Sequence, residues 1–293
     1  MNARPTLHIL FTMDCQAPTT GAVLGRPRNY EMSARSIESF CNRVLNAGYA
    51  VTLFVSPECA EEHGPLVEEL AGRGVEPGLY LHPQSLAGSR YKRPLGAYSA
   101  AEQREIIEYA RERVEAAVGL WPRSFRPDQF SANDDTFQVL YELGFRQGSV
   151  SNPGRTLRGH GTVWAGTEVD AHYVDPTNRL HSGNLPFLEI PVTADPERLG
   201  TGGVPYELCI ESGDVESWHR PIAEGQLQRM AEEDTSFRTL CIFTTNAVAY
   251  HLGDNRPSTN LDLLLDYLDT LDEHYEVVPV TLSSAHERFR RAA

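Results

Sequence analysis

The sequence lacks the features of several large classes of protein. No stretch approaches the roughly 18 to 20 apolar residues of a membrane span, and residues 1–10 contain no basic segment followed by an apolar one, as a secretion signal would. Five cysteines in 293 residues, with no C-x-x-C pair, argue against a disulfide framework and against a closed thiolate zinc site. We therefore expect a cytoplasmic protein.

Basic residues are also scarce. The chain has 26 Lys and Arg against 40 Asp and Glu, which gives a formal net charge of −14. A surface of that sign repels phosphate at long range, so we expect no general binding to nucleic acid or to anionic membranes. Two catalytic motifs are absent as well: the glycine-rich stretch 200–203 is not followed by the Lys-Ser/Thr of a phosphate-binding loop, and no G-x-S-x-G elbow occurs.

Short apolar runs alternate with longer segments of helical periodicity, as in proteins whose helices surround a parallel sheet. The expected strands are 7–14, 50–56, 78–82, 124–127, 145–150, 168–174, 187–193, 240–246 and 276–282. The expected helices are 33–48, 59–73, 100–118, 133–143 (opened by Asn133), 221–233 and 258–272. Ser99 and Glu102 have the spacing of a capping box before the helix 100–118. Units of this length favour one α/β barrel of parallel strands over an open sheet.

The segment 151–219 breaks this alternation. It is rich in Gly, Pro, Asn and His and has little helical periodicity. Long connections of this kind are uncommon in compact domains unless they form binding loops. We therefore expect a single domain over 1–293, with a loop-rich cap on one end of the barrel at about 151–219.

Polar side chains stand where the expected strands end. In a parallel barrel the carboxyl ends of the strands form the active site, so these side chains are expected to lie around one site. They are Asp14, Cys15 and Gln16; His82, Pro83 and Gln84; Arg126, Pro127 and Asp128; Asp170, His172 and Asp175; and Thr244, Thr245, Asn246 and His251.

Three of these strand ends resemble those of the polysaccharide deacetylases, also called the NodB-homology or carbohydrate esterase 4 family. They read TMD (12–14), LHP (81–83) and FRPDQFSAND (125–134), the last followed by a helix that ends in YELGF. The resemblance implies a distorted (β/α)7-type barrel that hydrolyses N-acyl groups with a divalent metal. In such a site Asp14 is a base and metal ligand, His82 is a metal ligand and Arg126 orients the base. The metal lowers the pKa of bound water, so that hydroxide attacks the amide carbonyl.

The chain departs from the family's pattern at three places. Cys15 replaces the second aspartate of a pair, Gly78 replaces the other histidine ligand, and the run 244–246 replaces the histidine that serves as general acid. His251 is then the candidate acid.

A zinc site can still be written with Asp14, Cys15 and His82 as ligands, completed by one of His172, His181 or His251, since all are acceptable ligand types. Adjacent strand residues point to opposite sides, however, so Asp14 and Cys15 share a metal only if the chain bends between them. A metal-bound and a metal-free site are both open.

The leading hypothesis is a hydrolase of non-peptide carbon–nitrogen bonds that removes an acyl group from a small N-acylated sugar or metabolite. Asp14, Arg126 and His251 are the expected catalytic residues. The expected substrate-binding residues are Gln84, Asp128, Gln129, His172 and Asn246. The missing secretion signal argues against cell-wall polymers as substrates. Two alternatives are a barrel that has lost its metal and only binds a carbohydrate or metabolite, and a lyase or isomerase that uses Asp14 as base and Arg126 as oxyanion stabiliser.

Overall fold

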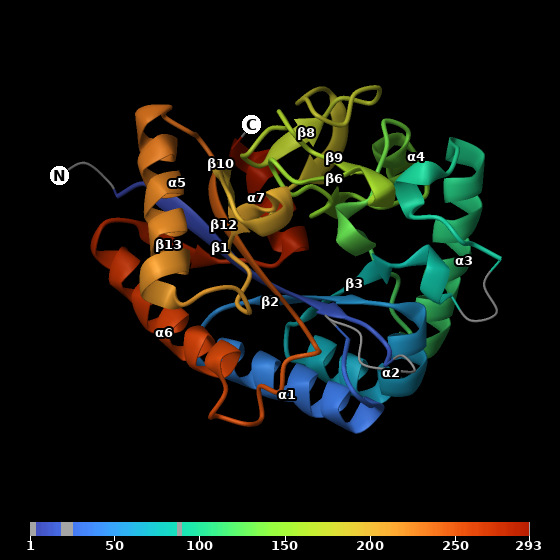
Figure 1. Cartoon of the computed structure of the whole chain (residues 1–293), viewed down its shortest axis with the longest axis horizontal. Helices are drawn as coiled ribbons and strands as arrows, with labels where there is room; N and C mark the ends of the chain where they lie inside the picture. Colours follow the sequence, from blue (N-terminus) through green and yellow to red (C-terminus); the bar gives the residue numbers. More distant parts are fainter. Residues whose placement is uncertain (1–3, 19–25, 87–89, 293) are drawn as a thin grey trace.

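A nine-stranded sheet lies at the centre of the molecule, and helices α1, α2, α3, α5 and α6 lie around its outside (Figure 1). The computed structural model describes residues 4–18, 26–86 and 90–292. The sheet has the order β12 (Arg238–Thr245), β1 (Thr6–Cys15), β2 (Val51–Val55), β3 (Glu76–Leu81), β4 (Ser124–Pro127), β5 (Gln147–Gly148), β9 (Leu185–Glu189) and β8 (His172–Val174), with β13 (Glu276–Pro279) beside β1. The helices are α1 (Tyr30–Asn46), α2 (Pro57–Gly72), α3 (Ala100–Val118), α4 (Thr136–Glu142), α5 (Arg220–Glu232), α6 (Arg256–Thr270) and α7 (Leu282–Ala292).

Strand β1 is the axis of this sheet. Every residue of it after Thr6 is buried, as expected of a parallel strand covered on both faces. One edge of β1 pairs with β12 along almost its whole length, and the other edge pairs first with β13 and then with β2. The carboxyl end of β1, which carries Asp14, therefore lies between the carboxyl ends of β12 and β2.

The sheet is curled into a barrel that does not close. All its pairs are parallel except β8 with β9, and in the described part of the chain the end strands β12 and β8 do not pair with each other. This architecture confirms the predicted α/β fold with a distorted (β/α)7-type barrel of parallel strands.

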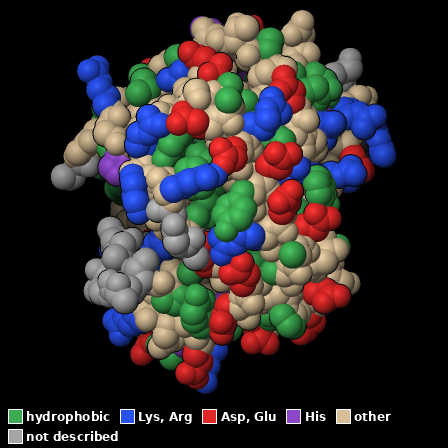
Figure 2. All heavy atoms as spheres, turned by 90° about the vertical axis from the view of Figure 1, so that its right-hand side faces the viewer, with side chains coloured by type: hydrophobic (Ala, Val, Ile, Leu, Met, Phe, Trp, Pro, Cys, Tyr) green, Lys and Arg blue, Asp and Glu red, His purple; other side chains and the backbone are tan. Residues whose placement is uncertain are grey.

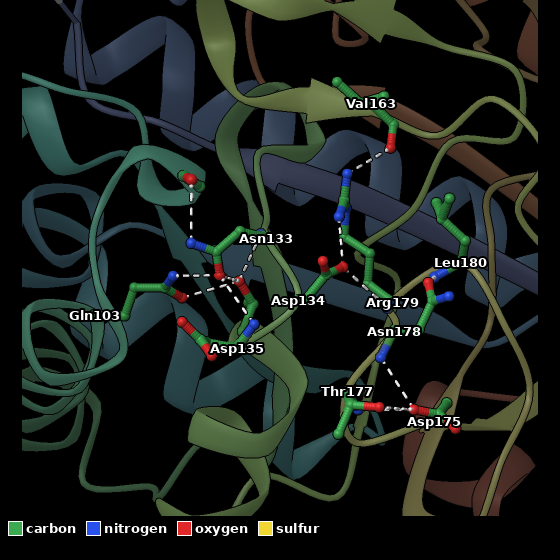
Figure 3. A network of polar contacts seen from close by, with 12 residues as sticks. Gln103, Asn133, Asp134, Asp135, Val163, Asp175, Thr177, Asn178, Arg179 and Leu180 are labelled. Atoms are coloured by element: carbon green, nitrogen blue, oxygen red, sulfur yellow. Dashed lines mark hydrogen bonds and ion pairs between the residues drawn. The ribbon is translucent and has the colours of Figure 1, made fainter.

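The helix expected at 133–143 begins later, at Thr136. Asn133 makes other contacts instead of capping it: its Nδ2 donates to the carbonyl oxygens of Gly96 (3.2 Å) and Tyr98 (2.9 Å), and its Oδ1 accepts from Gln103 Nε2 (2.8 Å), as Figure 3 shows in part. Asn133 thus joins the start of α3 to the chain that follows β4.

The C-terminal elements also differ from expectation. The strand expected at 276–282 ends at Pro279, and the amide of Val280 makes the last contact with β1 by donating to the carbonyl oxygen of Ile9 (3.0 Å). The chain then enters α7, which the sequence did not predict; the amide of Ala285 donates to the carbonyl of Thr281 in its first turn (2.9 Å).

The segment 151–219 contains two small antiparallel sheets besides β8 and β9. One is the hairpin β6 (Thr156–Leu157) with β7 (Thr162–Val163), and the other pairs β10 (Ala194–Leu199) with β11 (Pro205–Glu207). Among the described helices, none combines the length and the apolar character that crossing a membrane requires. Acidic and basic side chains both cover the face drawn in Figure 2.

Candidate active site

A cavity of about 400 Å³ opens at the carboxyl ends of β1, β3, β4 and β12. Its walls are mostly polar or charged, with aromatic rings between them. The residues around it are Asp14, Gln16, Arg26, Tyr80, His82, Gln84, Pro94, Asp128, Gln129, Phe130, Arg155, His160, Glu207, Phe243 and Thr245.

Asp14 is held from behind by the fully buried Arg126. Arg126 Nη1 donates to Asp14 Oδ1 and to Thr12 Oγ1, both at 2.9 Å. The rest of the guanidinium is fixed by Ser149, whose carbonyl accepts from Nε (3.1 Å) and whose Oγ accepts from Nη2 (2.8 Å). One face of the guanidinium lies 4.3 Å from the centre of the Phe54 ring. With all these partners, Arg126 has little freedom to move away from Asp14.

The second oxygen of Asp14 is available. In the described part of the chain no hydrogen bond reaches Oδ2, and Asp14 lines the cavity with a side chain that is 10% exposed. Burial raises the pKa of Asp14 from 3.8 to about 6, although the charge of Arg126 and its hydrogen bond act in the opposite direction. Asp14 is therefore a carboxylate at neutral pH that can still accept a proton.

His82 lies on the neighbouring wall, where its tautomer follows from its partners. Arg26 Nη2 contacts His82 Nδ1, and a guanidinium can only donate, so Nδ1 accepts and the proton lies on Nε2. Ser85 Oγ is 2.9 Å from the same Nδ1. His82 Nε2 lies 3.6 Å from Asp128 Oδ2, and Asp128 Oδ1 accepts from Tyr80 (2.6 Å). Burial lowers the pKa of His82, so the ring is neutral at neutral pH and presents an Nε2–H group.

The opposite wall comes from the segment 151–219. Arg155 Nη1 lies 3.5 Å from Glu207 Oε2, and its Nη2 donates to Gln129 Oε1 (2.9 Å). Asn152 Nδ2 donates to the same Glu207 oxygen (2.5 Å). Burial raises the pKa of Glu207, against the nearby charge of Arg155.

The structure brings together seven of the residues expected at the site. The cavity is lined by Asp14, Gln16, His82, Gln84, Asp128, Gln129 and Thr245, and Arg126 lies directly behind Asp14.

Four of the residues predicted as catalytic, substrate-binding or metal-ligating do not line the cavity. Cys15 is fully buried, and its pKa is raised by burial and by the neighbouring Cys59 and Cys41. It points away from Asp14, as strand alternation requires. His172 is buried on β8, where its Nδ1 lies 2.8 Å from the carbonyl oxygen of Asp170.

His251 and Asn246 follow β12 but lie outside the cavity walls. His251 Nδ1 is buried without a hydrogen-bond partner among the described residues. Asn246 holds the backbone of Gln16, since its Oδ1 accepts from the Gln16 amide (3.0 Å) and its Nδ2 donates to the Gln16 carbonyl (2.9 Å). Asn246 therefore positions a cavity residue from behind.

Sequence reasoning missed several cavity residues. The sequence does contain a signal for Tyr80, because Tyr80 precedes His82 by two residues and strand alternation places both side chains on one side of the sheet. Arg26, Arg155 and Glu207 come from segments without a regular pattern, and the sequence contains no signal for their position.

Gly78 explains why a second histidine ligand has no place here. It pairs with Phe54 across β3 and β2. A Cβ at position 78 would lie 2.9 Å from Phe54 Cδ1, closer than real Cβ atoms approach, and 3.0 Å from the carbonyl oxygen of Ser124, which is also tight. No side chain fits at position 78 while the Phe54 ring packs against Arg126.

The donor set does not fit a divalent metal. Among the described residues no group of three or more His, Cys, Asp or Glu side chains is arranged to hold one. The segments outside the described ranges, 1–3, 19–25, 87–89 and 293, contain none of these four residue types. We therefore derive no chemical step through a metal.

The architecture of this chain is similar to that of several solved structures. No protein-family model and no curated protein matches the sequence. A structure described as a polysaccharide deacetylase from Mycobacterium smegmatis is 16% identical, with a TM-score of 0.62 over 99% of this chain and 92% of that one. A probable polysaccharide deacetylase from Pseudomonas aeruginosa PAO1 is 15% identical, with a TM-score of 0.64 over 99% and 92%. The Puue allantoinase is 14% identical, with a TM-score of 0.65 over 99% and 91%. The chain therefore has the fold of the polysaccharide deacetylases, as its strand ends predicted.

Proposed function

We propose that this protein hydrolyses a carbon–nitrogen bond in a small polar amide, such as an N-acylated sugar or metabolite. The observation that carries the proposal is the state of Asp14. Its Oδ1 is held by Arg126, its Oδ2 is without a hydrogen bond in the described part of the chain, and its pKa is about 6. A carboxylate with these properties beside a cavity is suited to act as a general base.

The proposed reaction needs only groups of this chain and water. Asp14 accepts a proton from a water molecule as the water oxygen bonds to the carbonyl carbon of the substrate. The Nε2–H group of His82 donates a hydrogen bond to the carbonyl oxygen, on which negative charge develops. The carbon–nitrogen bond then breaks, and the proton held by Asp14 passes to the leaving nitrogen. The products are a carboxylic acid and an amine, and Asp14 returns to its starting state.

The cavity also supports the class of substrate. A volume of about 400 Å³ is at the small end of ligand sites, and its walls carry carboxylate, guanidinium and amide groups that match a hydroxylated or amide-rich molecule. The names of the three compared proteins, two deacetylases and an allantoinase, agree with hydrolysis of this kind of bond.

The proposal is tested by incubating the purified protein with a panel of N-acetylated sugars, N-acyl amino acids and cyclic ureides. Products are detected by proton NMR and mass spectrometry. Turnover that disappears in Asp14→Asn, and persists in a control with the exposed Asp266→Asn on α6, supports the proposal. Saturable binding of a panel member without any turnover would instead indicate a binding protein.

The rate of hydrolysis should follow the ionisation of Asp14. The base must be deprotonated, so kcat/KM falls by about tenfold per pH unit below the pKa of about 6 and is constant above it until another group titrates. Measuring kcat/KM from pH 4.5 to 8 on the substrate identified by the panel checks this. An acid limb near pH 4 would show that Asp14 has an ordinary pKa in the free protein.

Chelation should leave the protein unchanged. Because no three metal ligands come together among the described residues, we expect EDTA to alter neither kcat/KM nor Tm, and added zinc not to raise Tm as a ligand of the folded state would. Elemental analysis after dialysis and thermal unfolding with and without zinc measure this. One equivalent of tightly held zinc would show that the metal-free reaction is wrong.

A further inference from the structure

The turn that follows β4 has an unusual backbone. Gln129 and Phe130 adopt φ angles of 53° and 57°, in the left-handed region that disfavours residues with a side chain. Asp234 (51°) is the other non-glycine residue with positive φ in the described part of the chain. Two strained residues in succession, both lining the cavity, indicate a backbone held in place by its surroundings.

Two fully buried side chains hold this turn. Thr162 Oγ1 donates to the carbonyl oxygen of Gln129, and Trp164 Nε1 donates to the carbonyl oxygen of Phe130, both at 2.7 Å. The carbonyl oxygen of each left-handed residue therefore accepts a hydrogen bond from its own buried side chain. Both partners lie in or directly after β7 of the small β6–β7 hairpin.

Arg179 fixes the hairpin against the chain that follows the turn, as Figure 3 shows. Its Nη2 donates to the carbonyl oxygen of Val163 (3.1 Å), which lies between Thr162 and Trp164, and its Nη1 pairs with Asp134 Oδ1 (2.5 Å). The hairpin cannot move away from the turn without breaking these contacts.

The strained turn determines what the cavity presents. Gln129 Oε1 accepts from Arg155 Nη2, and no hydrogen bond from Nε2 is found among the described residues, so Nε2 is left as a donor in the cavity wall. The ring of Phe130 is placed 5.8 Å from the Arg126 guanidinium and 5.5 Å from that of Arg155. In an ordinary right-handed turn neither side chain would point in these directions.

We infer that Thr162 and Trp164 are positioning residues, which impose the left-handed turn so that Gln129 Nε2 donates to an oxygen acceptor of the substrate. This inference rests on the proposed function for the identity of the substrate, an amide with a carbonyl or hydroxyl oxygen beside the bond that is cleaved. The strain in the turn is a separate property that can be measured without any substrate.

The stability arm uses glycine to remove the strain. Gln129→Gly is expected to raise Tm by about 2 to 4 °C, because glycine adopts positive φ freely. Thr162→Val should lower the Tm of the native protein. It should lower the Tm of the Gln129→Gly variant by clearly less, because glycine adopts positive φ without the help of the Thr162 hydrogen bond. Equal losses in both backgrounds, or no gain from Gln129→Gly, would overturn the inference.

The activity arm separates positioning from general structure. On the amide identified by the panel, Gln129→Gly is expected to lower kcat/KM about 10-fold, the effect of one lost hydrogen bond to substrate, despite its higher Tm. Thr162→Ser, which keeps the hydroxyl, should retain the kcat/KM that Thr162→Val loses. Asp234→Gly is the matched control, since it relieves a left-handed residue that is not part of the cavity and should leave kcat/KM unchanged.

The two proposals fail in different ways. If no panel member is turned over, the proposed function has failed, and the stability arm alone decides whether Thr162 imposes the turn. If turnover occurs and Gln129→Gly keeps full kcat/KM, the positioning role is overturned while the proposed function stands.

Discussion

Asp14→Asn should lower kcat/KM for hydrolysis by about a thousandfold, the middle of the range for loss of a general base. Asparagine keeps an oxygen that accepts from Arg126 Nη1, so the contact that fixes this side chain is retained. It cannot accept the proton of a water molecule. Steady-state rates at pH 8, where Asp14 is ionised, give the largest difference, and Asp266→Asn on the exposed side of α6 controls for the change of charge.

The same substitution has a predicted effect on stability that depends on pH. The folded-state pKa of Asp14 is raised from 3.8 to about 6, so the folded protein binds this proton more tightly than the unfolded chain does. The stabilisation from protonated Asp14 is complete below pH 3.8 and is lost as the pH rises through 6, a change of about 3 kcal/mol. The asparagine side chain of the variant does not titrate. Urea denaturation should therefore show Asp14→Asn gaining stability relative to the native protein between pH 4 and pH 7. A constant difference over this range would contradict the raised pKa.

The sequence was sufficient for the central strands of the sheet because strands such as β1 and β2 are buried on both faces. An apolar run such as 7–13, ended by Asp14, predicts both a parallel strand and the place where its polar end emerges. Carboxyl ends of parallel strands meet at one edge, so the neighbourhood of Asp14, His82 and Arg126 followed from order along the chain alone.

The remaining parts of the site depend on contacts that no local pattern encodes. Arg155 reaches the cavity from the loop before β6 and Glu207 from the end of β11, and the packing of the segment 151–219 places both. Cys15 is a candidate ligand in the sequence because it stands where the family has its second aspartate, yet the side chains of Asp14 and Cys15 leave β1 on opposite sides, and Cys15 lies in the core. Gly78 marked a missing ligand in the sequence, but only the position of the Phe54 ring shows that no side chain fits there.

Arg126→Met is expected to be the most destabilising of these substitutions. Methionine fills much of the space of the arginine but leaves Asp14 as a buried carboxylate without its partner, which lowers the free energy of unfolding by about 3 to 5 kcal/mol. Because Arg126 lowers the pKa of Asp14, its removal raises that pKa further and moves the acid limb of kcat/KM to higher pH. An exposed substitution, Arg291→Met on α7, is the control for loss of one positive charge.

Two comparisons show whether the carboxylate is responsible for this loss. At pH 4.5 Asp14 is mostly protonated in the native protein, so Arg126→Met should destabilise less there than at pH 8. In an Asp14→Asn background the same change should also be milder, with a coupling free energy of about 0.5 to 3 kcal/mol in the double-mutant cycle. A loss that is equal at both pH values and in both backgrounds would mean that Arg126 stabilises the fold mainly through Ser149, Thr12 and the Phe54 ring, to which it is also bound. Arg126 would then be a structural residue that happens to adjoin the base.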